Sequence, residues 1–218
     1  MILAVDTATR WTGLALHSGA EVVAEHCWQS VNTQTVEVAP AVQRMLQRAG
    51  VTADDLKGVA VALGPGSYTG LRIGLGFAKG LALAHQMPLI GVPTLDIVAA
   101  AQPPSEGSLV VVAEAGRTRI TGGRYQWQAK KGWQADGTPV NDTWEGMLRR
   151  VEAPVTFAGE LSERALRMIR AAGKGHSVVP PAGRVRRPGY LAEIGWRRLR
   201  RGETDDPAAL TPLYLREP

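Results

Sequence analysis

The residues best able to do chemistry begin at Gly64, in a glycine-rich stretch that reads GPGSYTGLRIGLGFAKGLALA. Gly64, Gly66 and Ser67 follow an apolar run and precede a helical pattern, and such a loop can surround a phosphate with backbone N–H groups. Asp6 and Thr7 end another apolar run and would add a carboxylate and a hydroxyl to a phosphate or nucleotide site. The stretch matches neither GxxxxGK[ST] nor GxGxxG in its standard spacing. A tight strand-to-helix turn is the alternative for the loop, and a turn-capping carboxylate is the alternative for Asp6.

The helix predicted over residues 69–85 carries an unusual number of small side chains. They form two series at four-residue spacing: Gly70, Gly74, Ala78 and Gly76, Gly80, Ala84. A glycine inside a helix costs about 1 kcal/mol relative to alanine, so close packing must stabilise this helix. One face can meet the chain's own sheet while another meets a partner, or both faces can be internal.

Few residues are suited to bind a metal. The four histidines are scattered without ligand spacing, and Cys27 is the only cysteine, which excludes an internal disulfide and a cysteine metal cluster. Arginines are instead concentrated near residues 184–201, and four of them end a predicted helix: Arg197, Arg198, Arg200 and Arg201. These four are candidate contacts for an anionic partner such as RNA, although positive charge also suits the end of a helix dipole.

Composition and charge set wider limits. The 218 residues are 44% hydrophobic and 21% charged, as expected for one large globular domain or two small ones. Residues 1–109 have a net charge of −2 and residues 110–218 a net charge of +7, so the second half suits an anionic partner such as RNA. The N-terminus does not resemble a signal peptide, and the longest apolar stretch is too short to span a bilayer. We therefore expect a cytoplasmic protein without membrane contact.

These residues must be positioned by two α/β halves. In the first half, the patterns predict strands and helices in the order strand 2–5, strand 12–17, strand 21–27, helix 35–49, strand 59–63, helix 69–85 and strand 89–92. Residues 101–108 are typical of a linker. The second half is predicted to contain strands 109–113 and 118–126, helices near 143–151, 161–172 and 188–201, and a loop over 173–188. We therefore expect subdomains at 1–102 and 108–218, with the last helix packing back on the first subdomain.

Four segments together resemble the TsaB (YeaZ) family: MILAVDT at the start, the glycine-rich stretch, PLIGVPTLD over residues 88–96, and LTPLYLREP at the end. The resemblance is strong over residues 1–96 and at the C-terminus, and weak over about 115–188. It implies an α/β fold of the actin/hexokinase/Hsp70-like (ASKHA) type, reduced to two small subdomains. It also implies a non-catalytic partner, or scaffold, of TsaD in making N6-threonylcarbamoyladenosine beside the anticodon of tRNA. A TsaE-type ATPase would join the larger complex, and no cofactor is implied. tRNA would bind through the complex, and the candidate tRNA contacts are Arg197, Arg198, Arg200 and Arg201.

The resemblance also supplies a chemical test. TsaD-type proteins carry GVNHxxxH, whose two histidines hold the catalytic metal, whereas this chain reads GVPTLDIV. Thr94 and Val98 occupy the matching positions, and neither is a strong transition-metal ligand. The expected protein is thus a required subunit without a metal site of its own. The alternatives are a small-molecule kinase of the same fold, a metallopeptidase-like enzyme and a free-standing RNA-binding protein.

The two helices at about 35–49 and 69–85 are predicted to lie side by side on the sheet and to carry more apolar residues than one inner face needs. This surplus suits a four-helix bundle with the same helix pair of TsaD, or a self-pair when TsaD is absent. The predicted interface residues are Val36, Val42, Met45, Gly70, Leu71, Ile73, Gly74, Phe77, Ala78 and Leu81.

Overall fold

Two β-sheets organise the chain in the computed structural model, which describes residues 1–30, 33–114, 119–152, 154–173 and 175–215. Contacts divide it into unit 1, Met1–Ile97 with Arg187–Leu213, and unit 2, which holds Val98–Arg186 with Tyr214 and Leu215. The elements of unit 1 are β1 (Ile2–Asp6), β2 (Trp11–His17), β3 (Val22–Gln29), α1 (Gln34–Arg48), β4 (Val59–Gly64), α2 (Tyr68–Ala84), β5 (Leu89–Pro93) and α7 (Pro188–Arg200). A 3-10 turn, Ala53–Asp55, precedes β4, and a short helix, α3 (Thr94–Ala100), follows β5.

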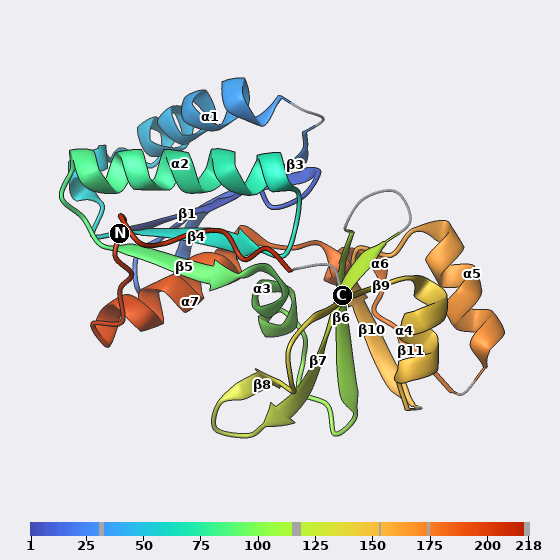
Figure 1. Cartoon of the computed structure of the whole chain (residues 1–218). Coiled ribbons are helices and arrows are strands. Elements are labelled where there is room, and N and C mark those ends of the chain that lie inside the picture. Colours follow the sequence, from blue (N-terminus) through green and yellow to red (C-terminus); the bar gives the residue numbers. More distant parts are fainter. Residues whose placement is uncertain (31–32, 115–118, 153, 174, 216–218) are drawn as a thin grey trace. The chain divides into compact units, whose positions relative to one another are not determined.

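The sheet of unit 1 has the strand order β3-β2-β1-β4-β5. Strands β1, β4 and β5 are parallel, and β2 and β3 extend the sheet as an antiparallel meander. Helices α1 and α2 cover one face and α7 covers the other (Figure 1). Because both faces are covered, β1 and β4 are buried along their whole length and read as continuous apolar runs.

Helix α1 buries one stripe against the sheet, at the spacing of a helix with one apolar face. Its buried residues include Val38, Ala41, Val42, Met45 and Leu46. Helix α2 begins at a Ser67 cap, whose side-chain oxygen accepts from the Gly70 amide at 3.3 Å. The two helices therefore contribute their inner faces to the core of unit 1.

Unit 2 has a sheet with the order β11-β10-β6-β7-β8, and β9 pairs with β7. Its elements are β6 (Ser108–Glu114), β7 (Ile120–Gln128), β8 (Gly132–Ala135), β9 (Val140–Asp142), α4 (Trp144–Arg150), β10 (Val155–Gly159), α5 (Glu163–Ala172), β11 (Ser177–Val178) and α6 (Pro181–Arg184). Aromatic and branched side chains from strands and helices form a separate core here, with Phe157 fully buried beside Trp144 and Ile169.

The predicted strands and helices of residues 1–92 are confirmed within two residues at each end. The loop predicted over 173–188 is wrong, since β11 and α6 lie within it, and α3, β8, β9 and β10 were not predicted. The strand start predicted at residue 118 lies outside the described residues. By contacts, the first part of unit 1 ends at Ile97, and residues 187–213 also belong to it, so α7 lies in the first unit, where the last helix was expected to pack. Among the described residues, no helix combines the length and apolarity needed to cross a membrane.

Candidate functional site

The glycine-rich loop between β4 and α2 is packed against the turn that follows β1. The Ser67 amide donates to the Ala8 carbonyl at 2.6 Å, and a Cβ at Gly66 would overlap the same carbonyl. Gly66 is therefore required by a close approach within the chain.

Thr7 extends this contact along α2. Its hydroxyl donates to the Gly70 carbonyl at 2.6 Å, and a Cβ at Gly70 or Gly74 would overlap the backbone or the hydroxyl of Thr7. Asp6 is 1% exposed, and its carboxylate accepts from the Ala8 amide at 2.9 Å, as the turn-capping alternative expected. Gly66, Gly70 and Gly74 are thus explained as packing partners of Thr7 and Ala8, so the presence of these three glycines no longer argues for a phosphate.

Thr94 joins the same region from the start of α3. It is fully buried, and its hydroxyl accepts from the Gly64 amide at 3.0 Å. Gly64 has φ +112°, and a Cβ there would lie 2.9 Å from the Leu213 carbonyl. Val98 is buried as well, at 3% exposure. Thr94 thus stabilises the loop, and in the part of the chain that is described no cluster of three His, Cys, Asp or Glu side chains could hold a metal ion.

The predicted partner interface needs correction, because most of its residues face the sheet. Six of the ten are buried inside unit 1: Val42, Met45, Gly70, Leu71, Gly74 and Ala78. The error has a clear cause, since both small-residue series on α2 have the same spacing, and Gly70 and Gly74 belong to the one that packs on Thr7.

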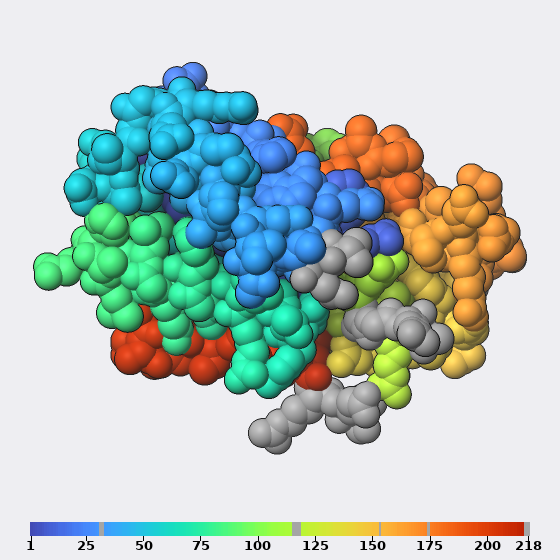
Figure 2. Space-filling model, turned by 90° about the horizontal axis from the view of Figure 1, so that it is seen from above, coloured from blue at the N-terminus to red at the C-terminus, as the bar shows by residue number. Residues whose placement is uncertain are grey.

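The other side of the same helices is exposed. Val36 is 70% exposed and Leu83 is 68% exposed, while Ile73, Phe77 and Leu81 are half-buried. Gly76 and Gly80 face open space, so a Cβ there would meet nothing within 4 Å. Figure 2 looks onto this side and shows α1 and α2 at the surface. We name the exposed and half-buried residues of this side the outer helix face: Val36, Tyr68, Ile73, Gly76, Phe77, Gly80, Leu81 and Leu83.

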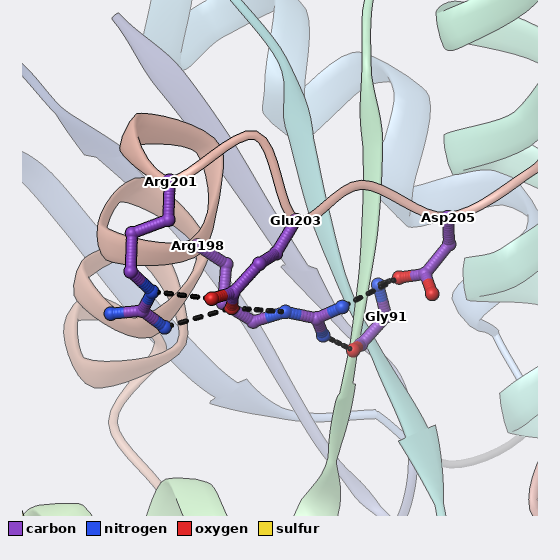
Figure 3. Close-up of polar contacts among 5 residues, drawn as sticks. All are labelled: Gly91, Arg198, Arg201, Glu203 and Asp205. Atoms are coloured by element: carbon purple, nitrogen blue, oxygen red, sulfur yellow. Dashed lines mark hydrogen bonds and ion pairs between the residues drawn. The ribbon is translucent and has the colours of Figure 1, made fainter.

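The arginines at the end of α7 are largely engaged within unit 1 (Figure 3). Arg198 donates to the Gly91 carbonyl at 2.5 Å and pairs with Asp205 at 3.3 Å. Asp205 also accepts from the Gly91 amide at 2.8 Å and donates its own amide to the Leu89 carbonyl at 2.8 Å. Arg198 is thus a structural residue that fastens the C-terminal segment to the edge of β5, which corrects its prediction as a tRNA contact.

Arg197 and Arg201 are exposed but paired. Arg197 pairs with Glu193 one helical turn away, and Arg201 makes two hydrogen bonds to Glu203, at 2.6 and 2.9 Å. The hydrogen bond from Arg201 lowers the pKa of the Glu203 carboxyl, and the same bond raises the pKa of Arg201. Their positive charge is largely balanced, and of the four predicted contacts only Arg200 is exposed without an ion pair in the described part of the chain.

Sequence reasoning missed two features. Gly76 and Gly80 belong to one of the two small-residue series of α2, but their spacing does not show that this series is the exposed one. Arg44 and Arg48 on α1 were not singled out, although two arginines four residues apart share a helix face.

Comparisons with known proteins agree with the fold and with the resemblance. A sequence profile of the family described as "TsaD: tRNA N6-adenosine threonylcarbamoyltransferase" matches residues 32–149. The tRNA threonylcarbamoyladenosine biosynthesis protein TsaB of Bacillus subtilis (strain 168) is 32% identical over 220 residues, which cover 99% of this chain and 93% of that protein.

Solved structures give the same result. YeaZ from Pseudomonas aeruginosa superposes with a TM-score of 0.79 and 26% identity, over 98% of this chain and 99% of that one. Component A of the (R)-2-hydroxyglutaryl-CoA dehydratase of Acidaminococcus fermentans, at 10% identity, has a TM-score of 0.52 over 90% of this chain and 98% of that one, a likeness of fold alone. The fold is the predicted ASKHA type, and the chain belongs to the TsaB (YeaZ) family.

Proposed function

We propose that the chain is a non-catalytic subunit in the synthesis of N6-threonylcarbamoyladenosine in tRNA, where it supports a TsaD-type catalytic partner. The observation that carries the proposal is the whole-length similarity to a TsaB protein, combined with Thr94 and Val98 at the two positions where a TsaD-type protein would have histidines. Thr94 is used internally, because its hydroxyl holds the Gly64 amide. A buried threonine in that role favours a supporting subunit over an enzyme.

The outer helix face is the surface best suited to that partner. Three of its side chains are exposed and large: Val36, Tyr68 and Leu83. Between them, Gly76 and Gly80 leave the backbone of α2 open, so a partner helix can approach closely. An exposed apolar patch of this kind on a globular chain is typical of a protein-protein interface. A second copy of the chain would pair through the same face when the partner is absent, and a TsaE-type ATPase would join the assembled complex.

A substitution at Gly80 tests this surface. Gly80→Arg adds a long charged side chain to open surface, so the chain should fold normally but lose the TsaD-type partner in a pull-down. Ala171→Arg, on the exposed side of α5, is the matched control and should leave the pull-down unchanged. A folded Gly80→Arg variant that still captures the partner at normal yield would refute the proposed interface.

The function itself is tested in cells. A strain depleted of its own TsaB should recover N6-threonylcarbamoyladenosine in its tRNA, measured by mass spectrometry of nucleosides, when this chain is expressed with its cognate TsaD-type protein. The chain alone, purified and supplied with substrates, should form none of the nucleoside. Modification by the purified chain alone would replace the supporting role with a catalytic one.

A further inference from the structure

A cavity of about 350 Å³ lies in unit 1 between the edge strand β3 and the helix α1. Its floor is apolar and consists of Ala24 from the strand with Ala41 and Met45 from the helix. Arg44 and Arg48 line its rim. The volume is at the lower end of the range for small-molecule sites.

Glu25 also lines the cavity, and Glu37 lies one helical turn before Ala41 on α1; the carboxylates of both residues are already engaged. Because side chains alternate along a strand, the side chain of Glu25 points to the opposite face of the sheet from that of Ala24. There the Glu25 carboxylate pairs with the Arg187 side chain and accepts from the Gly189 amide at 2.8 Å. The Glu37 carboxylate accepts hydrogen bonds from Ser30 at 2.5 Å, from Thr33 at 2.7 Å and from Trp28 at 2.9 Å. Among the described residues, neither carboxylate forms an ion pair with Arg44 or Arg48.

The arginines of the rim are therefore free to bind an anion. Arg44 and Arg48 are exposed, and within the described ranges neither side chain has an ion pair or hydrogen bond. They are four residues apart on one helix face, so their guanidinium groups can reach the same ligand. His26, whose ring lies 4.6 Å from that of Trp28, also lines the cavity from the strand side.

We propose that this cavity binds a small organic dianion, such as a phosphate monoester, with its apolar part on Ala24, Ala41 and Met45. Guanidinium groups match phosphate and carboxylate oxygens through paired, charge-assisted hydrogen bonds, which supply the anion half of the recognition. The apolar floor supplies the other half. The site is separate from the outer helix face and from the residues around Thr94.

Phenyl phosphate is a suitable probe, because it combines a dianion with an aromatic ring. Isothermal titration of the full chain should detect saturable binding that weakens with added salt. Arg44→Gln and Arg48→Gln should each raise the dissociation constant about tenfold, which is the loss of affinity expected for one charge-assisted contact. Arg149→Gln, at an exposed arginine of α4, is the matched control and should bind normally.

A second readout locates the ligand. With ¹³C-methyl-labelled methionines, the Met45 signal, assigned by its absence in Met45→Leu, should shift as phenyl phosphate is added. Inorganic phosphate should bind more weakly than phenyl phosphate, because it cannot use the floor. Equal losses in Arg149→Gln, an unmoved Met45 signal, or inorganic phosphate binding as tightly as phenyl phosphate would each overturn the proposal.

Discussion

Two groups of arginines in unit 1 have opposite surroundings. Arg197, Arg198 and Arg201 each face a carboxylate, and Arg198 also binds the Gly91 carbonyl. Arg44 and Arg48 stand above a cavity whose neighbouring carboxylates are held elsewhere. The sequence presents the first group as the basic one, because it lies in the half with a net charge of +7. The difference teaches that available charge depends on which carboxylates the fold brings near, rather than on the local number of arginines.

The largest expected effect is a difference between the two groups of arginines in how much a substitution lowers the free energy of unfolding. Arg198→Ala removes a hydrogen bond to Gly91 and ion pairs with Glu203 and Asp205 from a side chain that is only 26% exposed, and it leaves Asp205 without its cation. It should lower the free energy of unfolding by about 2 kcal/mol, whereas Arg44→Ala should change it by less than about 0.5 kcal/mol. Urea unfolding followed by tryptophan fluorescence measures both. Equal losses would mean that the two groups do not differ in structural role.

A smaller loss is expected for Asp205→Asn, which keeps an acceptor for the Gly91 amide but removes the charge opposite Arg198. Its free energy of unfolding should fall by about 1 kcal/mol. The change should be local, so the Gly91 amide should exchange hydrogen faster than in the parent chain, while amides of unit 2 keep their rates. Uniform acceleration across both units would show that Asp205 does not act on β5 alone.

Glu203→Gln should convert a paired arginine into a free one. The Glu203 carboxyl, whose pKa is lowered by the hydrogen bond from Arg201, is the partner that balances this arginine. The variant should therefore elute from a heparin column at higher salt, with an unchanged unfolding midpoint. Glu106→Gln removes the same charge from an exposed loop and is the matched control. Equal retention of both variants would attribute the effect to net charge alone.

The smallest effect concerns pH. Hydrogen bonds from Ser30, then Thr33 and Trp28, lower the pKa of the Glu37 carboxyl. A carboxyl whose folded pKa is depressed stabilises the fold above its unfolded pKa, and this contribution is lost as the pH falls through the folded value. Glu37→Gln should flatten the stability profile below about pH 4.5. Because the donors of Glu37 are neutral, added salt should not alter this difference, unlike phosphate binding at Arg44. A profile that is identical in both proteins would refute the assigned role.

Much of unit 1 could be predicted from the sequence, because β1 and β4 are apolar runs and the helices have clear periodicity. The two faces of α2 could not be told apart, since Gly74 and Gly76 belong to series of equal spacing, and only the approach of Thr7 decides which one is buried. The hydrogen bond from Arg198 to Gly91 and the ion pair between Arg187 and Glu25 join segments that are distant in sequence, so spacing did not reveal them. In unit 2, β11 has only two residues, which is too short for a periodic signal.

The return of residues 187–213 to unit 1 has a consequence for synthesis on the ribosome. Helix α7 covers the face of the first sheet that is opposite α1 and α2. There Leu191 and Ala192 of α7 pack on Ile2, Ala60 and Ile90. Roughly 100 residues are translated between β5 and α7, which takes about 5–20 s at typical elongation rates. During that interval the nascent chain carries a nearly complete sheet with one bare apolar face. A chaperone that binds emerging apolar segments should therefore engage this chain late in its synthesis, and release it once α7 has left the exit tunnel.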